Sequence, residues 1–288
     1  MKTWRVILIL AAAQFILVLD TTVMNVSISA VVADLNTTVE QVQLAITAYM
    51  LVMASTMLIG GKLGDIWGRR RAFRIGLVVF AVGSGLTSIA PNVGWLLFGW
   101  SLLEGLGAAI LVPALVALIA SNYEGQKRAT AYGIIGAVAA AGAAAGPLIG
   151  GAVTTAASWR VVFAGEVVIA IFVLLASGMI KDAPREKTGK LDWVGAGLSV
   201  VGLFMIVFGV LQSSSWGFIL PHNPPTIGGT EVTPLGLSPV PFMILAGFGV
   251  LGLFARWVQR REARGEEPLL RIALLRIKPL RGGAVMFF

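Results

Sequence analysis

The stretch "GKLGDIWGRRR", residues 61–71, determines how the rest of the chain is interpreted. Three glycines interrupt it at intervals of three and four residues: Gly61, Gly64 and Gly68. Glycine allows helices and loop backbone to approach closely. Asp65 and Arg69 are four residues apart, a spacing that permits an ion pair on one helical face. The stretch, which also includes Arg70, is predicted to be a charged turn whose contacts form and break with conformation. The alternative is an ordinary basic loop with incidental glycines.

The sequence on both sides of this stretch is apolar. Of the 288 residues, 57% are hydrophobic and 12% are charged, and the mean hydropathy is +0.87. Soluble domains carry about 25% charged residues, so the composition is that of a membrane protein. Continuous apolar runs approach or exceed the roughly 20 residues that a spanning helix needs, which favours helices over a barrel. The predicted spans are residues 6–32, 42–61, 73–90, 93–120, 129–153, 161–180, 193–211 and 240–258, with a ninth beginning at Gly282.

The basic residues set the predicted orientation. All 22 lysines and arginines except Arg160 lie before the first span, at the end of the eighth, or in loops on the same side. An excess of basic residues marks cytoplasmic loops. The chain is therefore predicted to be a multi-pass protein of the inner (plasma) membrane with a cytoplasmic N-terminus. On this interpretation the net charge of +8 reflects topology, and nucleic acid is excluded as a partner.

Three segments allow more than one interpretation. Basic residues before the first apolar run also fit a signal peptide, but Asp20 and its polar neighbours favour a retained span. Residues 266–281, "EEPLLRIALLRIKPLR", are either a basic connector or an interfacial amphipathic helix. Residues 213–241 are rich in Ser, Pro and Gly and are predicted to be irregular, with His222 solvated rather than proton-sensing.

Three carboxyl groups interrupt the apolar runs: Asp20, Glu104 and Glu166. At 1.5 Å per residue, each lies roughly 21–24 Å from the basic end of its span, so all three are predicted to share one layer near the opposite side. An ionised carboxylate within a bilayer costs about 2.5–3.5 kcal/mol on insertion scales. Asp20 and Glu104 are therefore predicted to be exchangeable acids, with Glu166 a third candidate. The structural alternatives are bonds from Asp20 to nearby Thr or Asn, and a pairing of Glu166 with Arg160.

The fifth predicted span has a small-residue face. Gly142, Gly146 and Gly150 recur every four residues and form a groove in which another backbone can pack. Pro147 removes a backbone donor and permits a kink. The segment is predicted to be a gate or seal between conformations, and the alternative is close packing alone.

These motifs resemble those of the major facilitator superfamily. The stretch at residues 61–71 is similar to the superfamily's signature between its second and third spans, and "GPLIGG" (146–151), which ends in Gly151, is similar to the antiporter motif of its exporters. "LDTTVMNVSISA" (19–30) and "LDWVGAGLS" (191–199) resemble first-span and seventh-span features of the fourteen-span drug:proton antiporters. The resemblance runs in register across the chain.

The resemblance implies an all-α integral membrane protein with the major facilitator fold. A six-span bundle is expected at residues 1–180, a linker with two extra spans at 181–259, and a basic segment with the start of a ninth span at 260–288. A second bundle would be missing, so the chain is expected to be the N-terminal portion of a longer protein.

The chain departs from the family pattern in two spans. In "SLLEG" (101–105), Ser101 stands where the exporters carry arginine, and Glu104 stands where they carry glutamine. In the sixth span, Glu166 replaces asparagine and Val168 replaces proline. These departures predict coupling through an acid pair where relatives use an acid with a base.

The expected function is proton-coupled efflux of amphipathic or cationic small molecules by alternating-access antiport. Two alternatives remain: an exporter of a specific lipid or metabolite with the same fold, and a half-transporter or scaffold that needs a partner chain. No enzyme, cofactor or metal site is expected, because cysteine is absent, histidine occurs once, and no catalytic set or phosphate loop stands out. The expected partners are the lipid bilayer, protons and the substrate.

Overall fold

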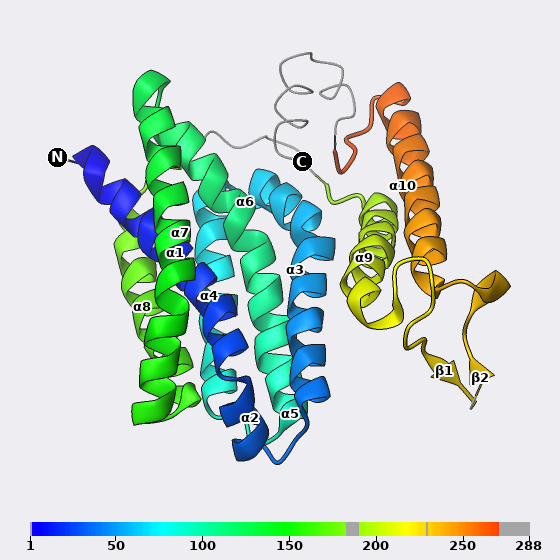
Figure 1. Ribbon diagram of the computed structural model, residues 1–288. Helices are drawn as coiled ribbons and strands as arrows, with labels where there is room; N and C mark the ends of the chain where they lie inside the picture. The colour runs from blue at the N-terminus through cyan, green and yellow to red at the C-terminus, as the bar shows by residue number, and fades with distance from the viewer. Residues whose placement is uncertain (1, 183–189, 229, 271–288) are drawn as a thin grey trace. The chain divides into compact units, whose positions relative to one another are not determined.

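The computed structural model describes residues 2–182, 190–228 and 230–270, which belong to two compact units, residues 1–187 and 188–288. Within this part of the chain, seven helical segments are long and apolar enough to cross a membrane. They match seven of the eight predicted spans: Trp4–Val26, Val39–Trp67, Val93–Asn122, Gly125–Ala156, Trp159–Met179, Trp193–Trp216 and Pro239–Ala263. The all-α membrane fold predicted from the sequence is confirmed (Figure 1).

The third predicted span is α4 (Arg69–Ser88), which differs from the others in composition. Its first turns contain four arginines, so it falls short of the apolarity expected of a spanning helix: Arg69, Arg70, Arg71 and Arg74. It nevertheless packs against α6 (Gly105–Asn122) and α8 (Trp159–Ala176). Its inner face carries fully buried Phe73, Leu77 and Phe80. This helix is therefore part of the core of unit 1.

Helix α1 (Lys2–Val26) crosses the bundle beside α7 (Gly125–Ala156) and also contacts α8 (Figure 1). Ile7, Leu10 and Ile16 of α1 are almost fully buried, as expected for a retained span. Regular helix stops at Ser27, whose hydroxyl is 3.0 Å from that of Thr154 on α7. A short helix, α2 (Ile28–Asp34), follows and leads into α3 (Val39–Trp67), which packs against α6.

The predicted glycine groove of α7 contacts α1. A β-carbon on Gly146 would lie 2.5 Å from Cβ of Thr22, and one on Gly150 would lie 3.0 Å from Val23. Gly142 faces Val18 in the same way, at 3.2 Å. The close-packing role of these three glycines is therefore confirmed. The helix continues through Pro147, and Gly151 makes only ordinary contact with Val26.

The fourth span is continuous but changes helix type along its length. It consists of α5 (Val93–Leu96), a π-helical segment η1 (Leu97–Glu104), and α6. The amide of Gly105 donates to the carbonyl of Trp100, five residues earlier. Such segments are often found at functional sites, and this one ends at Glu104.

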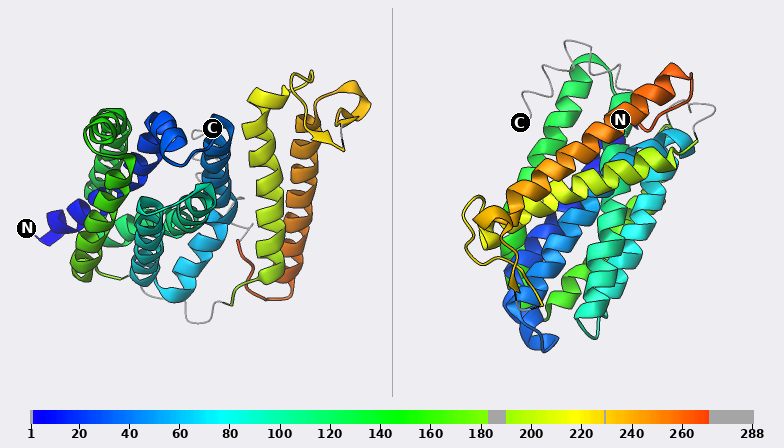
Figure 2. Two further views of the ribbon diagram at one scale, coloured as in Figure 1. Left: turned by 90° about the horizontal axis from the view of Figure 1, so that it is seen from below. Right: turned by 90° about the vertical axis from the view of Figure 1, so that its right-hand side faces the viewer.

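Unit 2 is a helical hairpin in which α9 (Trp193–Trp216) and α10 (Pro239–Ala263) lie side by side (Figure 2). Asp192, within the motif at residues 191–199, ties the start of α9 to the end of α10. Its carboxylate accepts hydrogen bonds from the Gly195 amide at 3.0 Å and the Trp257 indole at 3.1 Å, and it pairs with Arg261 at 3.3 Å. This explains why an aspartate precedes the seventh predicted span.

The prediction of an irregular loop at residues 213–241 is only partly correct. Helix α9 extends to Trp216, and the loop contains two short antiparallel strands, β1 (Thr226–Ile227) and β2 (Thr230–Glu231), and a 3₁₀ turn, η3 (Pro234–Gly236). Gly228 between the strands has φ of 61°, a conformation that favours glycine. His222 is exposed. The predicted start of a ninth span, and most of residues 266–281, lie outside the described residues.

Candidate functional site

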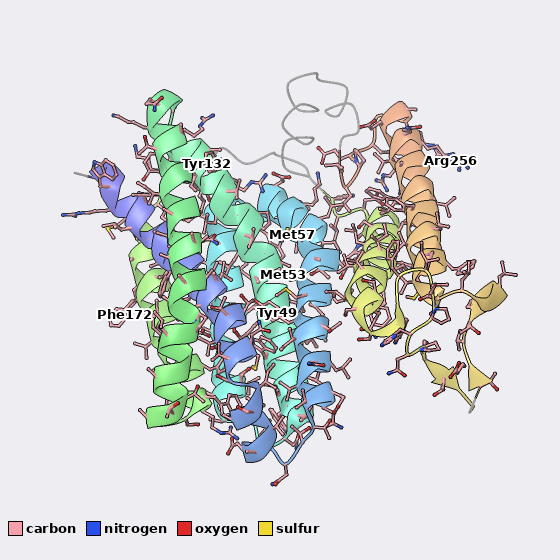
Figure 3. The ribbon with its side chains drawn as sticks, in the orientation of Figure 1. Tyr49, Met53, Met57, Tyr132, Phe172 and Arg256 are labelled. Atoms are coloured by element: carbon pink, nitrogen blue, oxygen red, sulfur yellow. The ribbon has the colours of Figure 1, made fainter. Side chains whose placement is uncertain are left out.

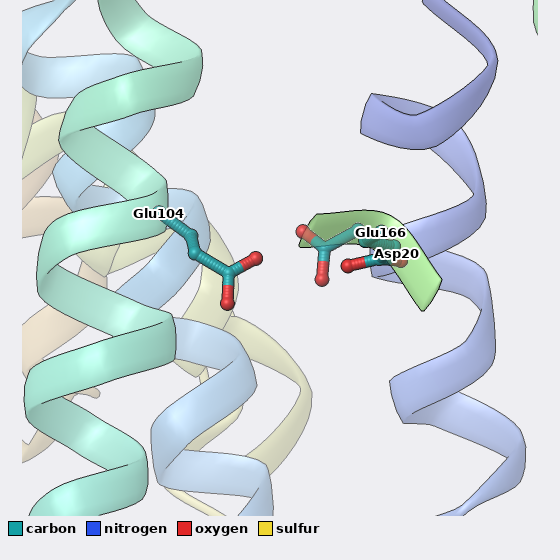
Figure 4. A group of neighbouring side chains, drawn as sticks. All are labelled: Asp20, Glu104 and Glu166. Carbon is teal, nitrogen blue, oxygen red and sulfur yellow. The ribbon is translucent and has the colours of Figure 1, made fainter. Parts of the chain in front are cut away.

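The three predicted acids meet inside unit 1. Asp20 comes from α1, Glu104 from the end of η1, and Glu166 from α8. One carboxylate oxygen from each lies within 4.8 Å of the others, and each residue is at most 1% exposed. Figure 4 shows the Glu104 carboxyl pointing toward the other two. We call Asp20, Glu104 and Glu166 the carboxyl cluster.

Each acid in the cluster has one bonded oxygen. Asp20 Oδ1 accepts a hydrogen bond from the indole Nε1 of Trp100 at 2.6 Å. Glu104 Oε1 lies 3.1 Å from the Thr87 hydroxyl, which it shares with the Gly83 carbonyl at 2.8 Å. Glu166 Oε2 lies 3.0 Å from the Ser84 hydroxyl, which it shares with the Phe163 carbonyl at 3.0 Å. Together, these neutral donors hold the three carboxyl groups in position.

The second oxygen of each acid has a different environment. Asp20 Oδ2, Glu104 Oε2 and Glu166 Oε1 are buried and have no hydrogen-bond partner among the described residues. A buried acceptor without a donor is costly, by about 1–3 kcal/mol and more when it is charged. The cluster is thus short of donors.

Electrostatic repulsion between the three carboxylates adds to the cost of this shortage of donors. Two ionised carboxylates 4.8 Å apart repel by about 3.5 kcal/mol at an effective dielectric constant of 20. Three such charges, with no basic group bonded to them in the described part of the chain, are stable only when protons or a cation offset some of the charge. The oxygens are close enough together to hold a small ion. The geometry therefore suits reversible binding of protons or of a cation.

The structural alternative for Asp20 does not hold in this geometry. The hydroxyls of Thr21 and Thr22 donate to the Val18 carbonyl, at 3.0 and 2.9 Å, and the Asn25 amide donates to the Thr21 carbonyl. These polar neighbours satisfy the helix backbone, and the Asp20 bond comes from Trp100 on another span.

Arg160 does not pair with Glu166 as the alternative for that residue supposed. Its guanidinium forms an ion pair with Asp34 of α2 at 2.8 Å and donates to the Ser88 carbonyl at 3.3 Å. Asp34 also accepts from the Trp159 indole at 2.9 Å. Arg160, the one basic residue predicted on the opposite side from the others, is thus paired with Asp34. Glu166 is not engaged by Arg160 and faces the other two carboxyl groups.

Ser101 has a structural role at the position where family exporters carry arginine. It is buried, and its hydroxyl donates to the Ala45 carbonyl of α3 at 2.7 Å. The hydroxyl satisfies a backbone acceptor on a neighbouring span and brings no positive charge to the cluster. Ser101 therefore does not supply the cluster with the positive charge that an arginine at this position would carry.

Four further residues that support the cluster were not predicted from the sequence: Tyr49, Ser84, Thr87 and Trp100. The rings of Tyr49 and Trp100 stack with centroids 4.9 Å apart, which orients the indole that binds Asp20. The available signal was that Ser84 and Thr87 are polar residues three apart in an apolar run. No local spacing links Trp100 to Asp20, because the two residues lie on different spans.

Trp100→Phe is expected to destabilise the protein by about 1–3 kcal/mol, because it removes the indole donor to the buried Asp20 Oδ1 while keeping an aromatic ring beside Tyr49. The readout is thermal unfolding of the purified whole protein. Trp95→Phe is the matched control, since Trp95 lies on the same span and is 45% exposed. Equal destabilisation by both variants would contradict the assigned role.

The signature stretch at residues 61–71 is more helical than predicted. Helix α3 runs through Gly61, Gly64 and Asp65 to Trp67, and only Gly68, with φ of 91°, separates it from α4. The prediction of a loop between spans ending at residue 61 and beginning at residue 73 was wrong, because no residue before Gly68 interrupts the helix. The predicted Asp65–Arg69 ion pair is present.

Arginines of this stretch also fasten helix ends together. Arg69 donates to the Gly61 carbonyl at 3.1 Å, across the α3–α4 turn. Arg70 donates to the Ile180 carbonyl at 3.1 Å, and the backbone amide of Arg70 donates to Asp182 at 2.9 Å. The stretch therefore links the end of α3 to the start of α4 and to the segment after α8.

Comparison with known proteins agrees with this fold. The family model of the Major Facilitator Superfamily matches residues 10–278. The chain is 29% identical to the tetracenomycin C resistance and export protein of Streptomyces glaucescens, over 99% of this chain and 49% of that protein. It is 36% identical to the puromycin resistance protein of Streptomyces alboniger, over 75% of this chain and 43% of the relative. The chain spans about half the length of the curated relatives it matches.

Solved structures of distant transporters share the fold. A peptide transporter in complex with alafosfalin is 16% identical, with a TM-score of 0.58, over 90% of this chain and 68% of that one. A proton:xylose symporter is 16% identical, with a TM-score of 0.54, over 73% of this chain and 52% of that one. Together with the spans and the family match, these findings show that this multi-pass membrane chain belongs to the major facilitator superfamily of transporters, not to a family of enzymes.

Proposed function

We propose that this chain is part of a proton-coupled exporter of amphipathic or cationic small molecules. The single observation that carries the proposal is the carboxyl cluster, with three unpartnered oxygens buried inside a transporter bundle. Ionisable groups inside a membrane bundle typically mark ion pathways and proton relays. Efflux as the direction is supported by relatives whose names describe export of, or resistance to, antibiotics.

In the proposed cycle, the cluster binds protons when it faces the side opposite the basic residues and releases them when it faces the basic side. Substrate binding on the basic side competes with protonation, so that one exchanges for the other. Trp100, Thr87 and Ser84 hold one oxygen of each acid throughout, which leaves the second oxygens available. The distribution of basic residues supports placing the N-terminus in the cytoplasm and the chain in the inner membrane.

The test is transport by the whole protein in liposomes. With an acidic lumen, ethidium or puromycin is expected to enter against its gradient while the luminal pH rises, because each imported molecule exchanges for outgoing protons. Liposomes without a pH gradient, and liposomes with an imposed sodium gradient, are the controls. Uptake driven by sodium alone would reject proton coupling, and uptake accompanied by inward proton flow would reject antiport.

A further inference from the structure

An open groove of about 520 Å³ lies on the surface of unit 1, lined by residues from α4 and α8. Its two parts differ in chemistry. Three arginines from the first turns of α4 line one part: Arg70, Arg71 and Arg74. Aliphatic side chains line the other, including Ile75, Val78 and Leu174. The groove therefore joins a basic wall to an apolar wall.

The arginines of this groove are not equivalent. Arg70 is used structurally, through its bonds to the Ile180 carbonyl and to Asp182. Arg71 and Arg74 are exposed, and neither has an ion pair or hydrogen bond with another described residue. Asp182 is the acidic member of the lining and already accepts the Arg70 amide. Among the described residues, these two exposed guanidinium groups are therefore the ones that can meet an anion.

The apolar wall continues along the helices away from the arginines. Val78 and Val82 follow Arg71 and Arg74 at helical spacing and are 45% and 52% exposed. On α8, Phe172 and Leu175 are also exposed but are not part of the groove lining, and Figure 3 shows Phe172 pointing away from the bundle. An apolar surface of this extent on a membrane helix pair is suited to lipid contact. One helical face thus passes from cations at its start to aliphatic side chains within the span.

We propose that this groove binds an anionic phospholipid, whose phosphate lies on Arg71 and Arg74 and whose acyl chain lies along Ile75, Val78 and Val82. Guanidinium groups bind phosphate through paired hydrogen bonds. Basic pockets between spanning helices are suited to acidic lipid headgroups. A free phosphate ion would use only the arginines, so the aliphatic wall is what identifies a lipid.

The test is native mass spectrometry of the purified whole protein titrated with phosphatidylglycerol, phosphatidylcholine or inorganic phosphate. The wild type is expected to retain phosphatidylglycerol in preference to phosphatidylcholine. Arg71→Gln with Arg74→Gln is expected to weaken phosphatidylglycerol binding about thirtyfold, the factor for two interfacial basic residues. Val78→Trp, which fills the apolar part, is expected to weaken lipid binding without removing charge.

The matched control removes two charges elsewhere in unit 1, by Arg5→Gln with Lys127→Gln. This control is expected to change phosphatidylglycerol binding less than threefold, about 0.6 kcal/mol. Equal losses in both double variants would overturn the site in favour of general charge attraction. Displacement of the lipid by inorganic phosphate, with no effect of Val78→Trp, would overturn it in favour of a phosphate site. If the glutamine variant fails to fold, Arg71→Lys with Arg74→Lys replaces it and is expected to bind phosphatidylglycerol more weakly than wild type; unchanged binding would count against the proposal.

Discussion

Asp20→Asn is expected to reduce proton-driven accumulation of substrate by the whole protein about 5- to 150-fold, the usual range of coupling between two sites. The substitution keeps the size of the side chain and an acceptor for the Trp100 indole, but it removes a group that can gain and lose a proton. Substrate exchange measured without a pH gradient should persist, because it requires substrate binding and conformational change but no net proton movement. Reduced proton-driven accumulation with unchanged substrate exchange would show that the variant has lost coupling while keeping its structure.

Glu104→Gln should show the same split, since its unpartnered oxygen lies with that of Asp20 in the cluster. If the acids act as a unit, the double variant should be little worse than either single variant. Glu40→Gln is the matched control, because it removes an exposed carboxylate near the same end of the bundle. Full proton-driven transport by both Asp20→Asn and Glu104→Gln would show that the cluster is not the coupling site.

Gly60→Ala is expected to destabilise the protein by about 1–3 kcal/mol or more, the cost of forcing extra volume into a tight core. An added β-carbon would overlap the Ala109 carbonyl oxygen and lie 2.7 Å from its carbon and 3.0 Å from Cα of Ile110. All of these are backbone atoms of α6, so they move only if α3 and α6 separate. The readout is thermal unfolding and the yield of folded protein in detergent.

Gly61→Ala is the control for this prediction. It lies next to Gly60 on α3, but the nearest atom to its added β-carbon is Cβ of Pro113 at 3.8 Å, an ordinary contact. The pair tests position rather than helix propensity, because both changes replace glycine by alanine in the same helix. Similar unfolding temperatures for the two variants would show that α3 and α6 can separate at Gly60 at little cost in stability, which would contradict the prediction.

The spans could be predicted because each is a long apolar run between basic or polar loops. The three acids could be placed in one layer from helix rise alone, since Asp20, Glu104 and Glu166 are similarly distant from the basic ends of their spans. Their actual meeting depends on how α1, the fourth span and α8 pack and rotate, which a single sequence does not specify. The close packing of Gly142, Gly146 and Gly150 followed from their four-residue period.

The π-helical segment, the donors to the acids and the exact position of the turn could not be predicted from the sequence. The π-helical segment at Leu97–Glu104 has an apolar composition like that of the α-helix around it. The roles of Trp100, Thr87 and Ser84 do not follow from the sequence, because buried polar residues of spans commonly bond to their own helix, as Thr87 also does at the Gly83 carbonyl. The turn predicted over residues 61–71 is confined to Gly68, because only this glycine has a backbone conformation that interrupts the helix.

The position of the carboxyl cluster along α1 has a consequence for the membrane potential. Asp20 lies about 27 Å by helix rise from Lys2 but only about 9 Å from Val26. If the membrane spans Trp4–Val26, most of the voltage drop falls between the cluster and the basic end of the bundle. Moving one charge across the full potential is worth about 2.3 kcal/mol per 100 mV. If protons enter from the opposite side, their binding should depend little on voltage, and their release toward the basic side should carry most of the electrical work.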